Sequence, residues 1–374
     1  MIVLLMLCIL IIVLEKKKWH CFSSPASLLS MGYASASLLS IIGACFFGFY
    51  SISELTCYLL SLSLFLFWLP SHFFKSASTN QTFSTDRLNG IEIIFFGVII
   101  FLILSCILIS YGFDIGNEMW EETYSNGIIA HLVNLLNVFL VYCLCKKKKT
   151  IAVVFVIMAS LFLIFASGTK YHILFPLICC FIYFIHKDIN RKKLLIASSL
   201  ICLLVFIIFY ANYYFGFMRR GFDMDNFSAF IVVHIIKYIS GGFIVLSEIL
   251  KNNPDAISFF NSTASINQAI PVSMIGEESN VCGLFGHFLL QYGYVWAYLV
   301  ILLLGLFSYF AYSKIINSNN ILYFISFCYF IGVPILLGFF ASYYHLLNIW
   351  EWSIISLLFS IIFKQQKIKQ CSYH

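Results

Sequence analysis

The chain alternates between long apolar segments and short polar ones. As an α-helix, about 20 apolar residues cross the hydrocarbon core of a bilayer, and tilt or polar flanks shorten that requirement. By this measure the sequence predicts eleven membrane spans. They lie near residues 1–14, 28–49, 55–70, 91–110, 128–144, 151–167, 173–186, 194–211, 288–312, 321–340 and 345–363.

The composition supports the same fold class. Hydrophobic residues make up 61% of the chain and charged residues only 10%, whereas about 25% are charged in soluble domains. We therefore predict an all-α integral membrane protein with one polytopic domain over residues 1–374. The 13 cysteines lie mostly inside apolar segments without metal-ligand spacing, so the sequence indicates no metal and no cofactor. The net charge of +6 comes from inter-helix segments and indicates no nucleic-acid partner.

The basic residues set the expected orientation of the spans. Membrane proteins keep an excess of Lys and Arg in their cytoplasmic segments. With eleven spans, most basic residues fall on one face, which is therefore expected to be cytoplasmic: Lys16–Lys18, Lys75, Arg87, Lys146–Lys149, Lys187, Arg191–Lys193, Lys314, Lys364, Lys367 and Lys369. The outer face then carries the turn 167–172 and one large loop, residues 211–287.

The loop 211–287 contains one segment that is itself apolar enough to span, Phe230–Leu250. His234, Gly241 and Glu248 recur seven residues apart in it, which gives an otherwise apolar helix one narrow polar stripe. This pattern favours an amphipathic or re-entrant helix docked on the outer face. The alternative, a helix that crosses, would move every later loop to the opposite face.

Two arginines near the start of this loop are the first candidates for chemistry. Arg219 and Arg220 follow a predicted span on the outer face, where the charge bias disfavours cations. Guanidinium groups offer forked donors that match phosphate oxygens. Tyr213 and Tyr214 lie just before them. The plain alternative is a pair of interfacial anchors.

A second candidate is the outer turn that contains Lys170 and His172. A Ser-Gly-Thr turn beside a cation suits an anionic headgroup, because its backbone N–H groups point outward. A lysine that snorkels from a helix end explains the pattern equally well.

The striped helix carries His234, Lys237 and Tyr238. A charge at membrane depth costs roughly 2.5–3.5 kcal/mol and needs a partner or a purpose. Ligand binding is one purpose, and an internal ion pair of Lys237 with Glu248 or Asp255 is the alternative. Gly241 and Gly242 would permit a close helix crossing or a kink.

The loop also supplies carboxylates that could act as a general base. They are Asp223, Asp225, Glu277 and Glu278. Glu278 and Asp223 are the candidate bases, His287 at the entry to the next span is similar, and simple solvation of the loop is the alternative. Outside the loop, Glu92 is expected at the membrane interface, and Glu351 in an aromatic belt with its tryptophan neighbours.

The arrangement resembles one known family. Three stretches resemble its weak signatures: Ser167–Lys170, Lys237–Gly242, and Asn280–Val281 followed by Gln291–Gly293. Together with the many spans and the large late outer loop, they make the chain similar to the Wzy-type O-antigen polymerases. Where many members have Arg in the turn, this chain has Lys170.

The resemblance implies an enzyme of the bacterial inner membrane with its active face in the periplasm. Such polymerases move a growing glycan from undecaprenyl diphosphate to the next lipid-linked repeat unit. Arg219, Arg220 and Lys170 would then hold the diphosphate leaving group. Tyr213, Tyr214, Tyr238 and Tyr292 would line the sugar groove. Membrane lipids, a chain-length regulator and a flippase are the implied partners.

Two other functions share this architecture. A flippase or exporter of lipid-linked oligosaccharides should carry charged residues within its spans, whereas here the polar residues gather on one outer loop. An O-antigen ligase shares the lipid donor, but an adjacent His-Asn pair expected of a ligase is not found near Asn280.

The predicted orientation can be tested in the turn 313–320. With eleven spans this turn is cytoplasmic, so a cysteine placed there should resist a membrane-impermeant maleimide in intact cells and react after permeabilisation. A cysteine in the loop 211–287 serves as the outer control. Labelling of both positions in intact cells would contradict the topology.

Overall fold

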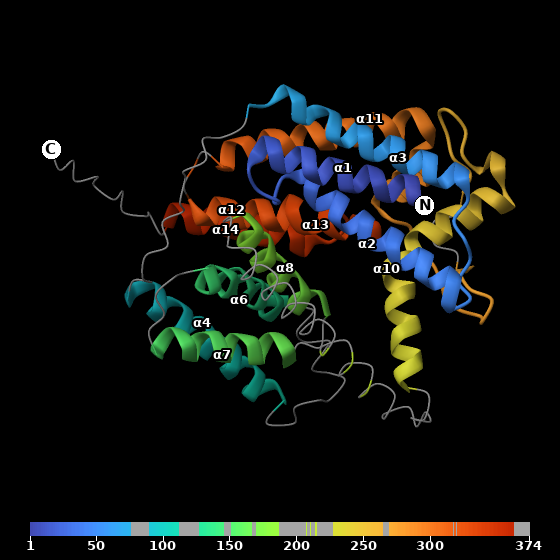
Figure 1. Ribbon diagram of the computed structural model, residues 1–374. Coiled ribbons are helices and arrows are strands. Elements are labelled where there is room, and N and C mark those ends of the chain that lie inside the picture. Colours follow the sequence, from blue (N-terminus) through green and yellow to red (C-terminus); the bar gives the residue numbers. More distant parts are fainter. Residues whose placement is uncertain are drawn as a thin grey trace. The chain divides into compact units, whose positions relative to one another are not determined.

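The structure is a computed structural model that describes residues 1–75, 90–111, 127–145, 151–166, 170–186, 227–264, 269–316 and 320–362, with the single residues 207, 210, 214 and 318. These residues are mostly helical (Figure 1). The chain divides into two compact units. The first is Met1–Thr79, Phe184–Ser313 and Ile331–His345, and the second is Asn80–Tyr183, Lys314–Phe330 and Leu346–His374.

The first unit contains long helices, short 3-10 turns and one small antiparallel strand pair. Its helices are α1 (Ile2–Trp19), α2 (Pro25–Phe46), α3 (Glu54–Trp68), α10 (Phe227–Asn252), most of α11 (Leu284–Ile316) and α13 (Val333–Leu336). Its 3-10 turns are Leu69–Phe73, Pro254–Ala256 and Leu337–Phe339, and its strands are β1 (Ile270–Pro271) and β2 (Glu278–Ser279).

The second unit is built from helices in its described part. They are α4 (Gly90–Tyr111), α6 (Gly127–Cys145), α7 (Ile151–Ala166), most of α8 (Lys170–His186), α12 (Ile321–Phe327) and α14 (Leu347–Ile362).

Several of these helices have the length and apolar character of membrane spans. In the described part of the chain, six segments meet both conditions: Pro25–Phe46, Glu54–Phe73, Gly127–Cys145, Phe230–Asn252, Leu284–Ile316 and Ile321–Phe339. Every predicted span coincides with a helix except 194–211, most of which lies outside the described residues. The prediction of an α-helical protein with membrane-length apolar helices is confirmed at this level.

Helix α11 is longer than the predicted span 288–312 and is broken near its start. Gly293 has φ 76°, and the N–H groups of Tyr294 and Val295 donate to the carbonyls of Ser258 and Phe259 at 3.0 and 2.9 Å. A Cβ at Gly293 would come within 2.6 Å of the Asn261 nitrogen. Glycine therefore permits both the left-handed conformation and the close approach of the 258–261 segment.

The predicted span 321–340 is also irregular. A π-helical turn, Cys328–Gly332, follows α12, and α13 contains Pro334 before the chain tightens into the 3-10 turn Leu337–Phe339. Proline lacks the N–H that would continue the regular ladder, so the backbone changes pitch around it. In this segment the carbonyl oxygens of Gly338 and Phe339 lie beside neighbouring backbone segments.

Those carbonyls meet two glycines. A Cβ at Gly242 in α10 would lie 2.7 Å from both the Gly283 nitrogen and the Phe339 carbonyl oxygen. A Cβ at Gly283 would lie 2.9 Å from the same oxygen. Three backbone segments therefore touch at a point that has no room for side chains, as expected for Gly242 from the sequence.

Helix α10 packs against the end of α2 and the connector that follows it. Ile236 packs beside Gly43 near the end of α2. Further along, Ser247 Oγ accepts a hydrogen bond from the Ser53 N–H at 2.8 Å, and Lys251 Nζ donates to the Ser51 carbonyl at 3.1 Å. Figure 1 shows α10, in yellow, meeting the end of α2. Ile236, Ser247 and Lys251 thus lie close to the 43–53 end, and Phe243 between them packs on Tyr33 further back in α2.

The opposite end of the unit is held by a buried carboxylate that the sequence did not reveal. Glu15 is 1% exposed and accepts hydrogen bonds from Trp68 Nε1 (2.9 Å), Ser71 Oγ (2.7 Å) and Tyr309 OH (2.7 Å). Nearby, Ser23 Oγ lies 2.7 Å from His186 Nδ1. These bonds join the ends of α1, α3, α8 and α11, and they satisfy a group that is otherwise costly to bury.

The glycine contact predicts a specific packing defect. Gly242→Ala should lower stability by about 1–3 kcal/mol, because the new methyl group meets backbone atoms that cannot rotate away. Gly97→Ala in α4 is the matched control, since its Cβ would meet nothing within 4 Å. Thermal unfolding in detergent measures both. Equal midpoints for the two variants would contradict the close approach.

Candidate functional site

An ion pair in the first unit joins the striped helix to the strand pair. Lys237 Nζ lies 2.5 Å from Glu277 Oε2, and the two side chains are 21% and 22% exposed. Gly276, at φ 87°, turns the chain back after β1, and the Val272 N–H then donates to the Glu277 carbonyl at 2.8 Å. The pair is therefore partly shielded from solvent, yet still open to a ligand.

The acid that meets Lys237 differs from the two expected from the sequence. Lys237 and Glu248 are eleven residues apart, which separates them by about 16 Å along a helix. Glu248 pairs instead with Lys251 at 2.6 Å, three residues further on. Asp255 lies in the exposed 3-10 turn after α10. The interpretation of an internal pair within this segment was wrong because only the tertiary fold brings Glu277 to Lys237.

A row of aromatic rings runs beside Lys237. His234 stacks on Phe230 with 5.1 Å between ring centroids and contacts Tyr238 at 4.8 Å. Tyr238 then stacks on Phe340 at 5.2 Å. Residues four apart share a helix face, so α10 presents Phe230, His234 and Tyr238 in one row. Phe340, from the segment after the turn Leu337–Phe339, extends this row into an aromatic ladder. Flat rings of this kind can stack on the apolar face of a sugar.

A further candidate, His287, lies near the start of α11. His287 interacts with the side chain of Gln291 and lies within electrostatic range of His345. The sequence pattern singled out His287 but not His345, which lies in the turn before α14. Beside them, burial raises the pKa of Tyr343 and Tyr344, so both hydroxyls stay protonated at neutral pH. They can donate hydrogen bonds but cannot act as bases.

The strand β2 lies against the same helix. A Cβ at Gly241 would be 3.3 Å from Ser279 Oγ, so this strand packs directly over α10. Glu278 is exposed and pairs across the ladder with Pro271. Next to this region, burial raises the pKa of the Cys282 thiol to about 12, which keeps it neutral and excludes it as a nucleophile.

Several of the predicted site residues lie in the first unit of the structure. His234, Lys237, Tyr238, Glu278 and His287 all lie in the first unit, where Tyr214 also stacks on Tyr210 at 6.2 Å. The residues Arg219, Arg220, Asp223 and Tyr213 lie outside the described residues, as does the side chain of Lys170.

His172 belongs to a polar network in the second unit. Its Nε2 lies 3.4 Å from Asn348 Nδ2, and its ring packs edge-on against Trp352. Asn134 Nδ2 in turn lies 3.3 Å from Asn348 Oδ1. The network joins α6, α8 and α14.

Glu351, expected in an aromatic belt with its tryptophan neighbours, completes this network. Its Oε1 lies 2.7 Å from His131 Nδ1, and its Oε2 accepts from Asn134 Nδ2 at 2.7 Å. Trp352 Nε1 donates to Asn134 Oδ1 at 2.9 Å. Two polar residues three apart on α6, and two more on α14, were the sequence signal that could have revealed this network.

Glu92, expected at the membrane interface, lies near the start of α4 and is buried within the protein. It is 4% exposed and accepts a hydrogen bond from Tyr142 OH at 3.1 Å inside the second unit. Its surroundings are protein side chains, because α4 packs against α6 there.

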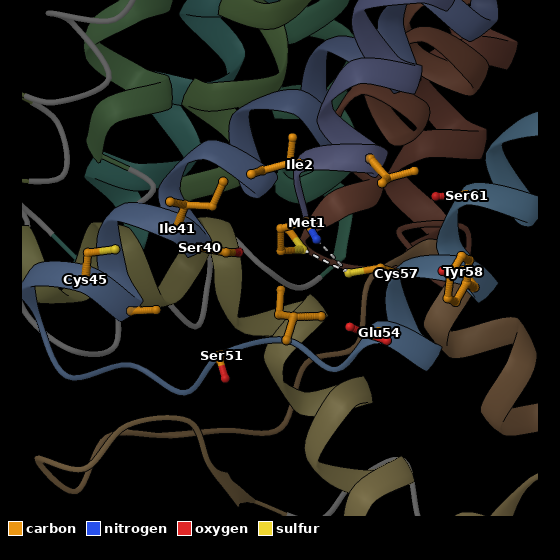
Figure 2. Close-up of a pocket in the computed structure, with 13 residues that line it drawn as sticks. Met1, Ile2, Ser40, Ile41, Cys45, Ser51, Glu54, Cys57, Tyr58 and Ser61 are labelled. Carbon is orange, nitrogen blue, oxygen red and sulfur yellow. Dashed lines mark hydrogen bonds between the residues drawn. The ribbon is translucent and has the colours of Figure 1, made fainter.

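A cavity of about 480 Å³ lies elsewhere in the first unit (Figure 2). The start of α1, the end of α2 and the start of α3 form its walls, which are mostly apolar with Glu54, Ser40 and Ser61 among the lining residues. None of the described candidate residues lines it. Among the described residues, no group of three or more His, Cys, Asp or Glu side chains could hold a metal ion.

Comparisons with protein families, with curated proteins and with solved structures found no match. Function is therefore inferred from the residues and their geometry.

The ion pair makes a measurable prediction. In a double-mutant cycle of Lys237→Ala and Glu277→Ala, we expect a coupling energy of about 1 kcal/mol in unfolding, because the pair is partly shielded from solvent. The pair Lys251 and Glu248 is the control; its lysine is 40% exposed, and we expect about 0.3–0.5 kcal/mol. Coupling no larger than the control would mean that Glu277 does not hold Lys237.

Proposed function

We propose that the protein polymerises lipid-diphosphate-linked oligosaccharide repeat units, in the manner of the Wzy-type O-antigen polymerases. The observation that carries the proposal is the partly shielded Lys237–Glu277 pair beside the aromatic ladder. A lysine ammonium suits a phosphate, and stacked rings suit a sugar. A lipid-diphosphate-linked oligosaccharide would bring both a phosphate and a sugar to the membrane surface.

The pair can respond to such a ligand. Glu277 neutralises Lys237, and its carboxylate sits on a tight turn after β1. A diphosphate has more negative charge than one carboxylate and would compete for the ammonium group. Charge-assisted hydrogen bonds of this kind are worth about 1.5–3 kcal/mol. Arg219, Arg220 and Lys170 are the further cations that the sequence assigns to the same leaving group.

The transfer itself would be a single displacement. The acceptor hydroxyl oxygen attacks the anomeric carbon of the donor, the bond from that carbon to the diphosphate oxygen breaks, and the electron pair leaves with the lipid diphosphate. A base takes the hydroxyl proton, and the sequence assigns this role to Glu278 or Asp223. The anomeric configuration is inverted by one such step.

We place this chemistry on the periplasmic face of the inner membrane. In support, three residues of α10 lie beside the 43–53 end of α2 and its connector: Ile236, Ser247 and Lys251. That end lies on the outer side in the eleven-span topology. The Glu15 network joins helix ends that the same topology places in the cytoplasm. An α10 that docks without crossing is consistent with both.

A flippase for the same lipid-linked units is the second candidate. The observation in its favour is Glu92, a carboxylate buried in an apolar helix of the second unit. A path for a polar headgroup needs such residues within the spans. The two candidates differ in what a deletion strain accumulates. Loss of a polymerase leaves a single repeat unit on the lipopolysaccharide core, whereas loss of a flippase or a ligase leaves none.

The role of the cations is tested by Arg219→Ala, Arg220→Ala and Lys237→Ala. Each should leave the protein in the membrane and lower long-chain polysaccharide by about 10- to 100-fold, because one charge-assisted bond to the leaving group is lost. Gel profiles of polysaccharide length measure the effect. Lys251→Ala removes a cation already paired with Glu248 and is the matched control. Normal length ladders from all three variants would remove the proposed site.

A further inference from the structure

Two successive turns in the loop 211–287 display large apolar side chains on the surface of the first unit. Phe259 and Phe260 form the tip of one turn and are 72% and 67% exposed. Met274 and Ile275 form the tip of the other and are 79% and 60% exposed. Single exposed apolar residues are ordinary on a protein surface, whereas grouped ones mark a contact surface. Both tips therefore call for an apolar partner.

The first turn is fixed to α11 at the break around Gly293. Its own ends are joined by the Ser258 N–H, which donates to the Asn261 carbonyl at 2.9 Å. The Val295 N–H of α11 donates to the Phe259 carbonyl at 2.9 Å. The tip is thus a fixed part of the helix surface.

The second turn is fixed to the end of α2. The Met274 N–H donates to the Gly48 carbonyl at 2.9 Å. A Cβ at Gly48 would lie 3.9 Å from Ile275 Cγ2. Phe46, the last residue of α2, is as exposed as Met274. Three large apolar side chains therefore surround the end of an apolar helix of membrane length.

Both turns lie at the end of the unit that is remote from Glu15. Lys251, shortly before the first turn, donates to the Ser51 carbonyl in the connector after α2. The start of α2 lies at the other end, where the Ala26 N–H donates to Tyr309 OH at 3.3 Å and Tyr309 donates to Glu15. In the predicted topology the two turns therefore lie on the outer side.

The length of α11 gives the depth of the first turn. Val295, which bonds the turn, and Tyr309, in the Glu15 network, are fourteen residues apart, about 21 Å along a helix. The hydrocarbon core of a bilayer is about 30 Å thick. With the Glu15 network at its inner boundary, Phe259 is level with the outer part of the hydrocarbon layer. Exposed apolar residues of α11 continue from there along the helix: Trp296, Leu299, Leu303 and Phe307.

The backbone of the first turn suits an apolar surrounding. Hydrocarbon offers no hydrogen bonds, so polar backbone groups beside it need partners within the protein. The Thr263 N–H donates to the Ala256 carbonyl at 2.9 Å, and the Ser262 N–H donates to Asn261 Oδ1 at 2.8 Å. Together with the bonds to α11, these contacts satisfy backbone groups on both sides of the tip.

We propose that the tips Phe259–Phe260 and Met274–Ile275 insert among the acyl chains of the leaflet at the outer end of α2 and anchor the loop there. Glu277 follows Ile275 by two residues, so the same anchor holds the Lys237–Glu277 pair at the level of the lipid headgroups. The partner is the lipid surface itself. The insertion concerns residues of the first unit alone and is separate from any glycosyl transfer.

The test places the photoreactive residue benzoylphenylalanine at position 259, 260, 274 or 275 of the full-length protein. The protein is illuminated in vesicles of phosphatidylethanolamine and phosphatidylglycerol that carry alkyne-tagged acyl chains. Each position should give lipid adduct at about tenfold or more the yield of position 253, because transfer of a large apolar side chain into hydrocarbon is favoured by at least that factor. Asn253 is exposed in the same loop and is the matched control. Phe307 in α11 is the positive control.

A charge at the second tip tests whether its apolar character holds it in the leaflet. With the photoreactive residue at position 274, Ile275→Asp should lower the lipid adduct by about tenfold or more, because a carboxylate is costly in hydrocarbon. Ile275→Leu should leave the yield unchanged. In both variants the yield from position 307 should stay the same, which shows that the protein remains folded in the bilayer.

Yields from the tips no higher than from position 253 would overturn the proposal. Adducts to the protein's own chain in place of lipid would also overturn it. In native membranes, adducts to a second protein without lipid adducts would assign the tips to a protein partner and overturn it as well. None of these measurements needs polymer formation. Failure of the anchor is therefore distinct from failure of the proposed polymerase, which the deletion strain tests.

Discussion

The first unit depends on the contact of three backbone segments at Gly242 and Gly283. Without side chains there, α10 can touch both the segment after β2 and the carbonyl of Phe339. That contact sets the neighbours of the whole helix face: Lys237 reaches Glu277, and Tyr238 reaches Phe340. A methyl group at the contact would separate the elements, and the charged and aromatic residues would lose their common site.

The second unit is organised by a different constraint, the need to satisfy polar groups among apolar helices. Glu351 in α14 finds Asn134 in α6, which in turn is fixed by Trp352. Glu15 in the first unit solves the same problem with three neutral donors. The difference lies in exposure, because Glu15 is enclosed while Glu351 has the open imidazole of His131 beside it.

Irregular helices account for much of what the sequence pattern missed. The apolar runs predicted spans over 288–312 and 321–340. Hydropathy depends on residue type alone, so it does not reveal a change of helix pitch. Gly293 breaks α11 because the 258–261 segment packs against its backbone, and the turn Cys328–Gly332 widens the helix before Pro334. Likewise, the stripe on α10 indicated that Lys237 needs a partner, but the partner came from a segment forty residues away.

The sequence by itself determined the apolar helices and the polar stripe of α10, because these follow from residue type and helical period. At Gly241 and Gly242 it indicated a close crossing or a kink, and the structure shows the close approach at Gly242. The sequence also marked His234, Lys237, Tyr238 and His287 as residues of one region. Only the tertiary structure decided that Lys237 meets Glu277 and that Glu351 meets His131. The reason is physical: a helical pattern shows which side chains share a face, whereas pairing across elements depends on how the backbones pack.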